Sequence, residues 1–284
     1  MIRLAAFADE ACPKVTGQIA ALKRNGMEYI ELRGLDGKNV SQITEEEARN
    51  YAKMFADEGI KVWSIGSPLG KVDIDSDLEA HRALLHHVCK IANIFGTKRI
   101  RMFSFYKSYD CEDKVMAELR EMVKIADEYG VMLCHENEKQ IFGDTLERVL
   151  KIKSAVSGLY HIYDPANFLE CDQDAADTLA ALHKDTEYFH IKDVISATGE
   201  LVPAGYGDGK IDKLVAMIPE DADKTLTIEP HLAIFAGYSE IDNTEMKNKF
   251  HFSSNDEAFD AAVNAIKRVL EAQGYKPEDG GYVK

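Results

Sequence analysis

The stretches VMLCHENE (131–138) and LYHIYDPANF (159–168) decide the fold of this chain. Each starts with a short, mostly apolar run that is typical of a buried strand and reaches an acidic side chain, Glu136 in the first and Asp164 in the second. A helical pattern occupies residues 144–154 between them. Consecutive parallel strands need a crossover of this kind, so the strand–helix–strand order predicts parallel pairing.

The same alternation extends outward to both ends of the chain. The predicted strands are residues 2–7, 29–33, 61–66, 98–103, 131–136, 158–163, 187–191 and 224–229. The predicted helices are residues 14–25, 44–58, 77–95, 112–129, 144–154, 174–183, 211–217 and 256–273. Eight such units predict an α/β fold, a (β/α)₈ TIM barrel with parallel inner strands and outer helices, which spans residues 1–284 as a single domain. An open doubly wound sheet also fits the alternation, but no G-x-G-x-x-G motif follows a strand.

The composition narrows the classes of function. Hydrophobic residues make up 45% of the 284 residues, enough for a substantial core, and the formal net charge is −15. Because nucleic-acid binding depends on Lys and Arg that neutralise phosphates, we expect no nucleic-acid partner. No run approaches the ~20 apolar residues of a membrane span, and the five cysteines are scattered without CxxC spacing. We therefore expect a soluble, cytoplasmic protein with reduced thiols and no membrane partner.

Two connections between predicted elements are unusually long. Residues 192–210 are rich in glycine, and residues 230–255 are rich in aromatic and polar side chains such as Phe235, Tyr238 and Phe250. Both follow strands, so in a barrel both lie at the C-terminal ends of the strands, the barrel mouth, where active sites sit. We expect them to cover the mouth or to contact a neighbouring subunit, in a homo-oligomer or with a different chain.

Ionisable residues occur at or near the ends of four successive predicted strands: Glu136, Asp164, His190 and Glu229. In a barrel these ends converge on one arc of the mouth. Clustered carboxylates repel one another unless a cation compensates them, so the pattern predicts one bound divalent metal ion. Three carboxylates and one imidazole suit Mn²⁺ best and leave Mg²⁺, Co²⁺ and Zn²⁺ open. The structural alternative is that these acids pair with buried Lys or Arg.

Four motifs carry a resemblance to a known family: HENE (135–138), YDPANF (163–168), FHIKD (189–193) and IEPH (228–231). They resemble those of the sugar phosphate isomerase/epimerase superfamily, the xylose isomerase-like TIM barrels. This superfamily includes ketose 3-epimerases, hydroxypyruvate isomerases, inosose dehydratases and apurinic endonucleases. The resemblance covers nearly the whole chain and implies that the same four ionisable residues are the metal ligands.

The resemblance also implies that Glu136 and Glu229 are catalytic and move protons on the two sides of a bound sugar. A divalent ion that chelates a carbonyl and the neighbouring hydroxyl acidifies the adjacent C–H bond, and a carboxylate can then remove and return the proton. The expected activity is metal-dependent isomerisation or epimerisation of a small ketose or keto-sugar. Two features depart from the family pattern: Asn167 stands where many members have His, and residues 194–201 lack the Arg that usually follows the ligand His.

Other polar residues near the ligands are candidates for substrate binding. They are Lys192, Asn167, Glu138, His231 and Ser67. Strand alternation gives Lys192 the same facing as His190, although an ion pair with Asp193 is an equal alternative. For Ser67, together with Lys71, a turn is the simpler interpretation.

Several nearby residues are predicted to lie outside the metal site. Glu31 and Arg33 are expected to form an ion pair with each other, with substrate contact as the alternative. His135 and His161 stand an odd number of positions from their strand's ligand, so they should face the helices. Cys134 faces inward but is predicted to pack in the core.

Other functions fit parts of the same pattern. After proton removal, loss of a β-substituent would give a lyase or dehydratase acting on a keto-sugar or inosose, and Asn167 and the missing Arg favour this alternative. A DNA-repair nuclease would need more histidines and a basic groove. A non-catalytic sugar-binding subunit is the third alternative, although a complete ligand set argues against it.

Overall fold

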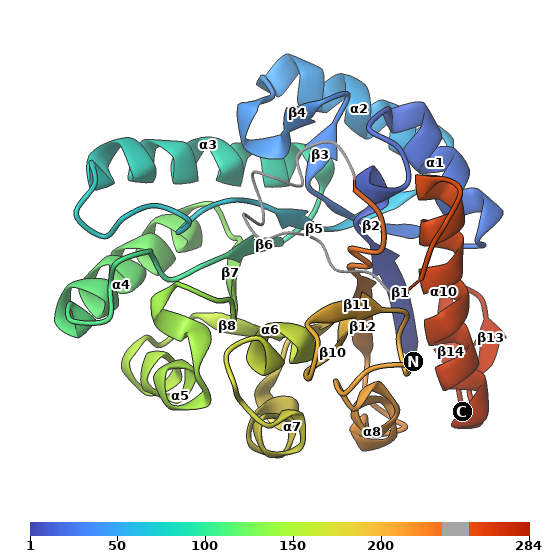
Figure 1. The fold of residues 1–284 in the computed structure, drawn as a ribbon. Helices are drawn as coiled ribbons and strands as arrows, with labels where there is room; N and C mark the ends of the chain where they lie inside the picture. The colour runs from blue at the N-terminus through green and yellow to red at the C-terminus, as the bar shows by residue number, and fades with distance from the viewer. Residues whose placement is uncertain (235–249) are drawn as a thin grey trace.

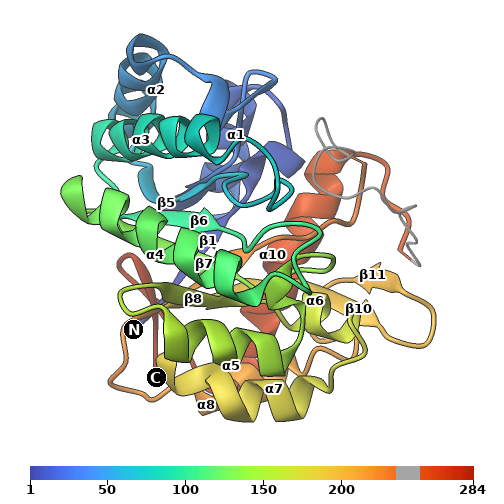
Figure 2. The same cartoon turned by 90° about the vertical axis from the view of Figure 1, so that its left-hand side faces the viewer.

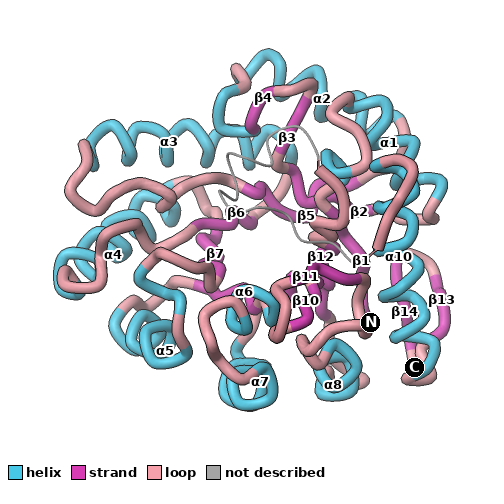
Figure 3. The backbone as a smooth tube through the Cα atoms, in the orientation of Figure 1, coloured by secondary structure: helices cyan, strands magenta, loops and turns pink. Residues whose placement is uncertain are grey.

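The computed structural model describes residues 1–234 and 250–284 as a closed barrel of parallel strands surrounded by helices (Figure 1). The barrel strands are β1 (Ile2–Ala6), β2 (Tyr29–Leu32), β5 (Lys61–Gly66), β6 (Arg99–Met102), β7 (Met132–Glu136), β8 (Tyr160–Tyr163), β9 (Tyr188–Ile191) and β12 (Lys224–Ile228). Parallel hydrogen-bonded pairing runs from β2 through β5, β6, β7, β8, β9 and β12 to β1. Contacts between β1 and β2 close the ring, which confirms the predicted TIM barrel (Figure 3).

The outer helices occupy the predicted positions within a few residues. They are α1 (Val15–Arg24), α2 (Glu45–Asp57), α3 (Leu78–Phe95), α4 (Glu112–Glu128), α5 (Leu146–Ala155), α7 (Ala175–Leu182), α8 (Ile211–Met217) and α10 (Asn255–Ala272). Local signals set their ends: Thr44 and Glu47 form a capping box at the start of α2, and Gly96 ends α3 in the left-handed conformation at φ 71°. The helices bury one face against the strands, so the core forms a layer around the barrel.

Short elements decorate this frame. The additional helices are η1 (Ala8–Glu10), η2 (Val40–Gln42), η3 (Phe142–Asp144), α6 (Pro165–Leu169) and η4 (His183–Asp185). Antiparallel hairpins are formed by β3 (Gly34–Leu35) with β4 (Lys38–Asn39), β10 (Asp193–Ile195) with β11 (Glu200–Val202), and β13 (Lys276–Glu278) with β14 (Gly281–Val283). The last hairpin pairs with β1 through Tyr282 and Ile2, an addition that the sequence analysis did not predict.

The long segment 192–210 folds back on the side chain of Asp193. Its carboxylate accepts hydrogen bonds from the backbone N–H groups of Gly205 (2.8 Å), Gly207 (3.0 Å) and Gly209 (2.9 Å). A Cβ atom at Gly207 would lie 2.3 Å from Asp193 Oδ1, so only glycine fits this close approach. The β10–β11 hairpin of this segment lies at the opposite end of the barrel from the two termini, at the mouth (Figure 2).

The second long segment is only partly described. Residues 235–249, including Phe235 and Tyr238, lie outside the described residues, so the predicted cover over the mouth stays a prediction. At its far end, the ring of Phe250 contacts Tyr206 at 5.6 Å between ring centroids. None of the helices in the described ranges is long and apolar enough to cross a membrane.

Candidate metal centre at the barrel mouth

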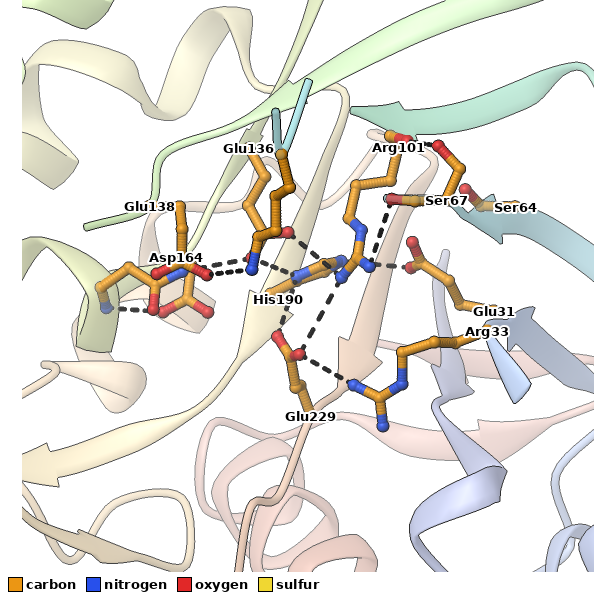
Figure 4. Close-up of polar contacts among 12 residues, drawn as sticks. Glu31, Arg33, Ser64, Ser67, Arg101, Glu136, Glu138, Asp164, His190 and Glu229 are labelled. Atoms are coloured by element: carbon orange, nitrogen blue, oxygen red, sulfur yellow. Dashed lines mark hydrogen bonds and ion pairs between the residues drawn. The ribbon is translucent and has the colours of Figure 1, made fainter. Parts of the chain in front are cut away.

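The four predicted ligands meet at the C-terminal ends of neighbouring strands (Figure 4). Glu136 ends β7, Asp164 directly follows β8, His190 lies in β9 and Glu229 directly follows β12. One ligand atom from each lies within 4.8 Å of the others, and all four residues are buried. Residues that are far apart in the sequence therefore form one compact set of three carboxylates and one imidazole.

Local structure holds Asp164 at this point. One carboxylate oxygen caps helix α6 by accepting the N–H of Asn167 at 3.0 Å, and Pro165 occupies the first helical position. The side chain of Asn137 bonds the backbone N–H and C=O of Asp164 at 2.9 and 2.8 Å, which ties the end of β7 to the end of β8. The motif YDPANF thus encodes a rigid strand–helix corner.

The donor set fits a divalent cation. Among the described residues, Glu136 Oε2, Asp164 Oδ2 and Glu229 Oε2 are buried and have no hydrogen bond of good geometry, although Arg101, Lys192 and His190 each lie 3.3 Å from one of them. Incompletely satisfied buried carboxylate oxygens are costly, and a cation that coordinates them would reduce that cost. With His190 Nδ1 they provide three hard oxygen ligands and one nitrogen, a combination suited to Mn²⁺, Mg²⁺, Co²⁺ or Zn²⁺.

Buried cations also contact the ligands. Arg101 Nη1 lies 3.3 Å from Glu136, Arg33 Nη1 lies 3.3 Å from Glu229, and Lys192 Nζ lies 3.3 Å from Asp164. The alternative prediction, that these acids pair with buried Lys or Arg, therefore holds in part. The negative charge nevertheless exceeds the positive charge in the buried region. The buried carboxylates there are Asp9, Glu10, Glu31, Glu136, Asp164 and Glu229, and the buried Arg and Lys side chains are Arg33, Arg101 and Lys192.

The environment raises the pKa values of two ligands for different reasons. Burial raises the pKa of Asp164 to about 7, although Lys192 opposes the shift. Burial alone would lower the pKa of His190, but the carboxylates of Glu136 and Glu31 outweigh burial and raise that pKa well above its usual value. In the metal-free protein, protons thus partly take the place that a cation would fill.

The predicted substrate residue Lys192 lies beside the ligands. Its ammonium group donates to Asn167 Oδ1 at 2.6 Å, and Asn167 in turn donates to Glu136 Oε1 at 3.2 Å. The alternative ion pair with Asp193 is not favoured, because that carboxylate accepts four backbone N–H groups of its own segment. Lys192 and Asn167 therefore form a polar bridge from Asp164 to Glu136.

The other predicted substrate residues have protein partners. Glu138 accepts from Lys71 at 3.0 Å, and His231 Nε2 lies 3.3 Å from Glu229. Ser67 donates its hydroxyl to the backbone carbonyl of Arg101 at 2.6 Å, which favours the turn interpretation. Whether any of these side chains binds a substrate stays a prediction.

The residues that were predicted to lie outside the ligand set have other partners. His135 Nε2 is hydrogen-bonded to Ser104 at 2.9 Å, and its ring packs against His161. Cys134 packs in a small core cluster. The predicted ion pair between Glu31 and Arg33 is replaced by other contacts. Glu31 contacts His190 and Tyr188, and Arg33 contacts Asp9, Glu10 and Glu229.

Sequence reasoning missed Arg101, Asp9 and Glu10 as members of this region. Arg101 is in register with the inward-facing Cys134, so strand alternation alone could have placed it inside the barrel. Asp9 and Glu10 lie in η1, three and four residues beyond the end of β1, and this position near a strand end was an available signal.

Known proteins share this architecture. A family model described as a xylose isomerase-like TIM barrel matches residues 19–245. Among curated proteins, no sequence matches this chain. The solved structure of L-ribulose 3-epimerase is 20% identical, covers 96% of each chain and superposes with a TM-score of 0.72.

Two further structures show the range of relatives. The IOLI protein, whose solved structure holds a zinc atom, is 15% identical, covers 95% of this chain and 99% of its own, and has a TM-score of 0.71. The probable 3-DHS dehydratase AsbF from Bacillus anthracis is 16% identical, covers 94% of this chain and 99% of its own, and has a TM-score of 0.70. Identities this low establish a shared fold and leave the reaction open. From the family match and the architecture together, the chain belongs to the xylose isomerase-like TIM barrel family.

Proposed function

We propose that this protein is a metal-dependent isomerase or epimerase that acts on a small ketose or keto-sugar by proton transfer beside the carbonyl. One observation carries the proposal. Three buried carboxylates and the imidazole of His190 converge at the barrel mouth, with one ligand atom from each within 4.8 Å of the others. When bound there, a divalent ion would polarise a carbonyl and its neighbouring hydroxyl and acidify the adjacent C–H bond.

Glu136 and Glu229 are the proposed acid–base residues. Both carboxylates contact His190 Nδ1, at 3.0 Å and 3.3 Å, so both lie at the candidate metal centre. Burial alone would raise the pKa of Glu229, but Lys192 and His231 outweigh burial and hold it well below its usual value. Glu229 is therefore ionised at neutral pH and can accept a proton.

The surroundings suit a polyhydroxylated ligand. A cavity of about 140 Å³ lies beside the centre and is lined by Arg33, Lys71, Arg101 and the polar side chains of η2. These groups can donate hydrogen bonds to sugar oxygens. Structures that share the fold include an L-ribulose 3-epimerase and a D-allulose 3-epimerase from Methylomonas sp. in complex with D-allulose, and this supports a ketose as the substrate class.

Mn²⁺ is the proposed metal. Three carboxylate oxygens and one imidazole nitrogen fit its preference for mixed, mostly hard ligands. The solved structures of two relatives hold zinc and magnesium, so the fold accepts more than one ion. Metal analysis of protein produced in a medium with balanced trace metals would identify the ion.

A second candidate, elimination, is favoured by the position of Lys192. Its ammonium group lies between Asp164 and Asn167, where it could stabilise negative charge on a departing oxygen. A probable dehydratase also shares the fold. Product mass separates the two candidates, because isomerisation conserves mass and dehydration does not.

The test is solvent exchange. Metal-loaded enzyme is incubated in D₂O with a panel of ketoses and keto-sugars, and deuterium incorporation is followed by NMR and mass spectrometry. We expect exchange at the carbon beside the carbonyl, and a fall of ~10²-fold or more in Glu136→Gln and Glu229→Gln, which keep an oxygen ligand, and so largely keep the metal, but lose the proton acceptor. Glu118→Gln, which removes a buried acid paired with Arg82 elsewhere, is the control. Turnover in which hydrogen migrates intact between carbons would contradict the two-glutamate mechanism.

A further inference from the structure

A chain of buried hydrogen bonds reaches His190 from the side opposite the ligand cluster. Glu31 in β2 is fully buried, and its Oε2 lies 3.2 Å from His190 Nε2. The hydroxyl of Tyr188 donates to the other oxygen, Oε1, at 2.8 Å. Ser64 in β5 is 3.0 Å from the same hydroxyl. Three strands thus contribute to the support of one imidazole.

The chemistry of these groups fixes the direction of each bond. An ionised carboxylate only accepts hydrogen bonds, so His190 Nε2 carries the proton that points to Glu31. The single hydroxyl proton of Tyr188 goes to Glu31, and Ser64 must then donate to Tyr188. His190 Nδ1 is left facing Glu136 and Glu229 at 3.0 and 3.3 Å.

Packing restricts the imidazole ring as well. The rings of Phe7 and Tyr188 lie 5.3 and 5.6 Å from the His190 ring between centroids, and Phe7 meets it edge-on. A ring flip would place Cε1 where Nε2 lies and remove the bond to Glu31. The aromatic contacts therefore fix the plane of the ring, and the carboxylate of Glu31 selects which way round it lies.

Stability alone does not account for Glu31. It places another carboxylate, fully buried, beside three ligand acids in a region with excess negative charge. An apolar residue of similar volume would avoid that cost. A carboxylate is useful here because it orients a metal-binding histidine and increases the basicity of the ligating nitrogen.

We propose that Glu31, supported by Tyr188 and Ser64, is a positioning residue that makes Nδ1 of His190 the metal-ligating atom. The inference rests on the metal site of the proposed function. It concerns metal binding rather than turnover, so it is testable without knowledge of the substrate.

The experiment measures zinc binding by the full-length protein. Affinities of wild type, Glu31→Gln and Tyr188→Phe are determined by competition with a chromogenic chelator, with thermal unfolding as a check on folding. We expect a loss of about 10- to 100-fold in Glu31→Gln, as is usual when a carboxylate behind a ligand histidine is replaced, and a smaller loss in Tyr188→Phe.

The chain offers a matched control for Tyr188. Tyr163, in the neighbouring strand β8, is also a fully buried tyrosine with a bonded hydroxyl, but its partners are Ala175 and Thr178. Tyr163→Phe should leave zinc affinity unchanged within about twofold, since it loses a hydrogen bond of similar kind away from His190. An equal loss in Tyr163→Phe and Tyr188→Phe would mean that both act through the fold.

A second measurement tests the ligand atom directly. Nitrogen-15 NMR of the zinc-loaded protein should show His190 protonated at Nε2 and bound through Nδ1. Zinc on Nε2, or unchanged affinity in a folded Glu31→Gln variant, would overturn the inference and leave the metal site standing. A wild-type protein that binds no divalent ion would refute the metal site, and the inference with it.

Discussion

The barrel mouth is built from two arcs with different chemistry. The four candidate ligands lie in or directly after strands β7, β8, β9 and β12, whereas Arg101 in β6 and Arg33, directly after β2, contact two of those ligands from the rest of the ring. Each ligand occurs in a short motif at the end of its strand. Arg101 reaches Glu136 from the neighbouring strand, and Arg33 reaches Glu229 because the sheet closes between β1 and β2. Local sequence thus specifies the ligand arc, and the pairing and closure of the sheet specify how its charge is balanced.

The two arcs also differ in how their residues contribute to metal binding and to stability. The arginines and Lys192 neutralise part of the ligand charge, and a metal ion would neutralise more. The two arcs should therefore respond differently to substitution: loss of a ligand should remove the metal, whereas loss of an arginine should leave the metal and destabilise the metal-free protein most. The following predictions test this difference, from the largest expected effect to the smallest.

Asp164→Ala should abolish metal binding, because it removes a fully buried ligand. Elemental analysis should give about one divalent ion per wild-type chain and almost none in the variant. The control is Asp174→Ala, since Asp174 also caps a helix through its carboxylate but is exposed. Equal metal content in wild type and Asp164→Ala would refute the ligand assignment.

Arg101→Met should lower the free energy of unfolding of the metal-free protein by about 3 kcal/mol, because it leaves Glu136 buried without its counter-charge. With metal bound the loss should be smaller, since the ion compensates the same carboxylate. Denaturant unfolding with and without metal measures both values. Arg99→Met is the control: Arg99 lies on the same strand but pairs with Glu187, and both side chains are partly exposed to solvent. An identical loss in both metal states would show that Arg101 does not share the charge of the metal site.

Stability should also depend on pH through His161, which lies in the ligand arc but faces the helices. Burial, with a smaller effect of Lys153, lowers its pKa to about 4, against 6.5 in the unfolded chain. Since the unfolded state binds the proton more readily, the stabilisation is complete above pH 6.5 and is lost as the pH falls toward 4. Between pH 7 and 5 this histidine should cost about 2 kcal/mol. His161→Leu should flatten the pH dependence of the unfolding free energy by that amount, and a variant with the wild-type slope would contradict the assignment.

Ser67→Ala should have the smallest effect. The hydroxyl of Ser67 is bonded to the carbonyl of Arg101, so its loss should cost about 1 kcal/mol of stability and change KM little. Ser76→Ala removes a similar hydroxyl-to-carbonyl bond at an exposed position and should cost less. A large rise in KM in Ser67→Ala alone would restore Ser67 as a substrate contact.

Features that depend on local interactions could be predicted from the sequence, and features that depend on contacts between distant parts of the chain could not. Glu136, Asp164, His190 and Glu229 were predictable because strand ends and helix caps are local, and parallel strands bring their ends together. The role of Glu31 was not predictable, because it depends on the reach of its side chain from β2 to β9 across the barrel interior. The C-terminal hairpin was missed because its three-residue strands show no hydrophobic alternation.

The carboxylate of Asp193 should determine how the segment at the barrel mouth opens. It accepts hydrogen bonds from backbone amides as far along the chain as Gly209, so one side chain holds the two ends of segment 193–209 together. Its amides should be released to solvent together, in one opening event, rather than fray one at a time. Hydrogen exchange at Gly205, Gly207 and Gly209 should then show a single shared rate, which Asp193→Asn would raise for all three. We therefore expect this side of the barrel mouth to open and close as one unit rather than residue by residue.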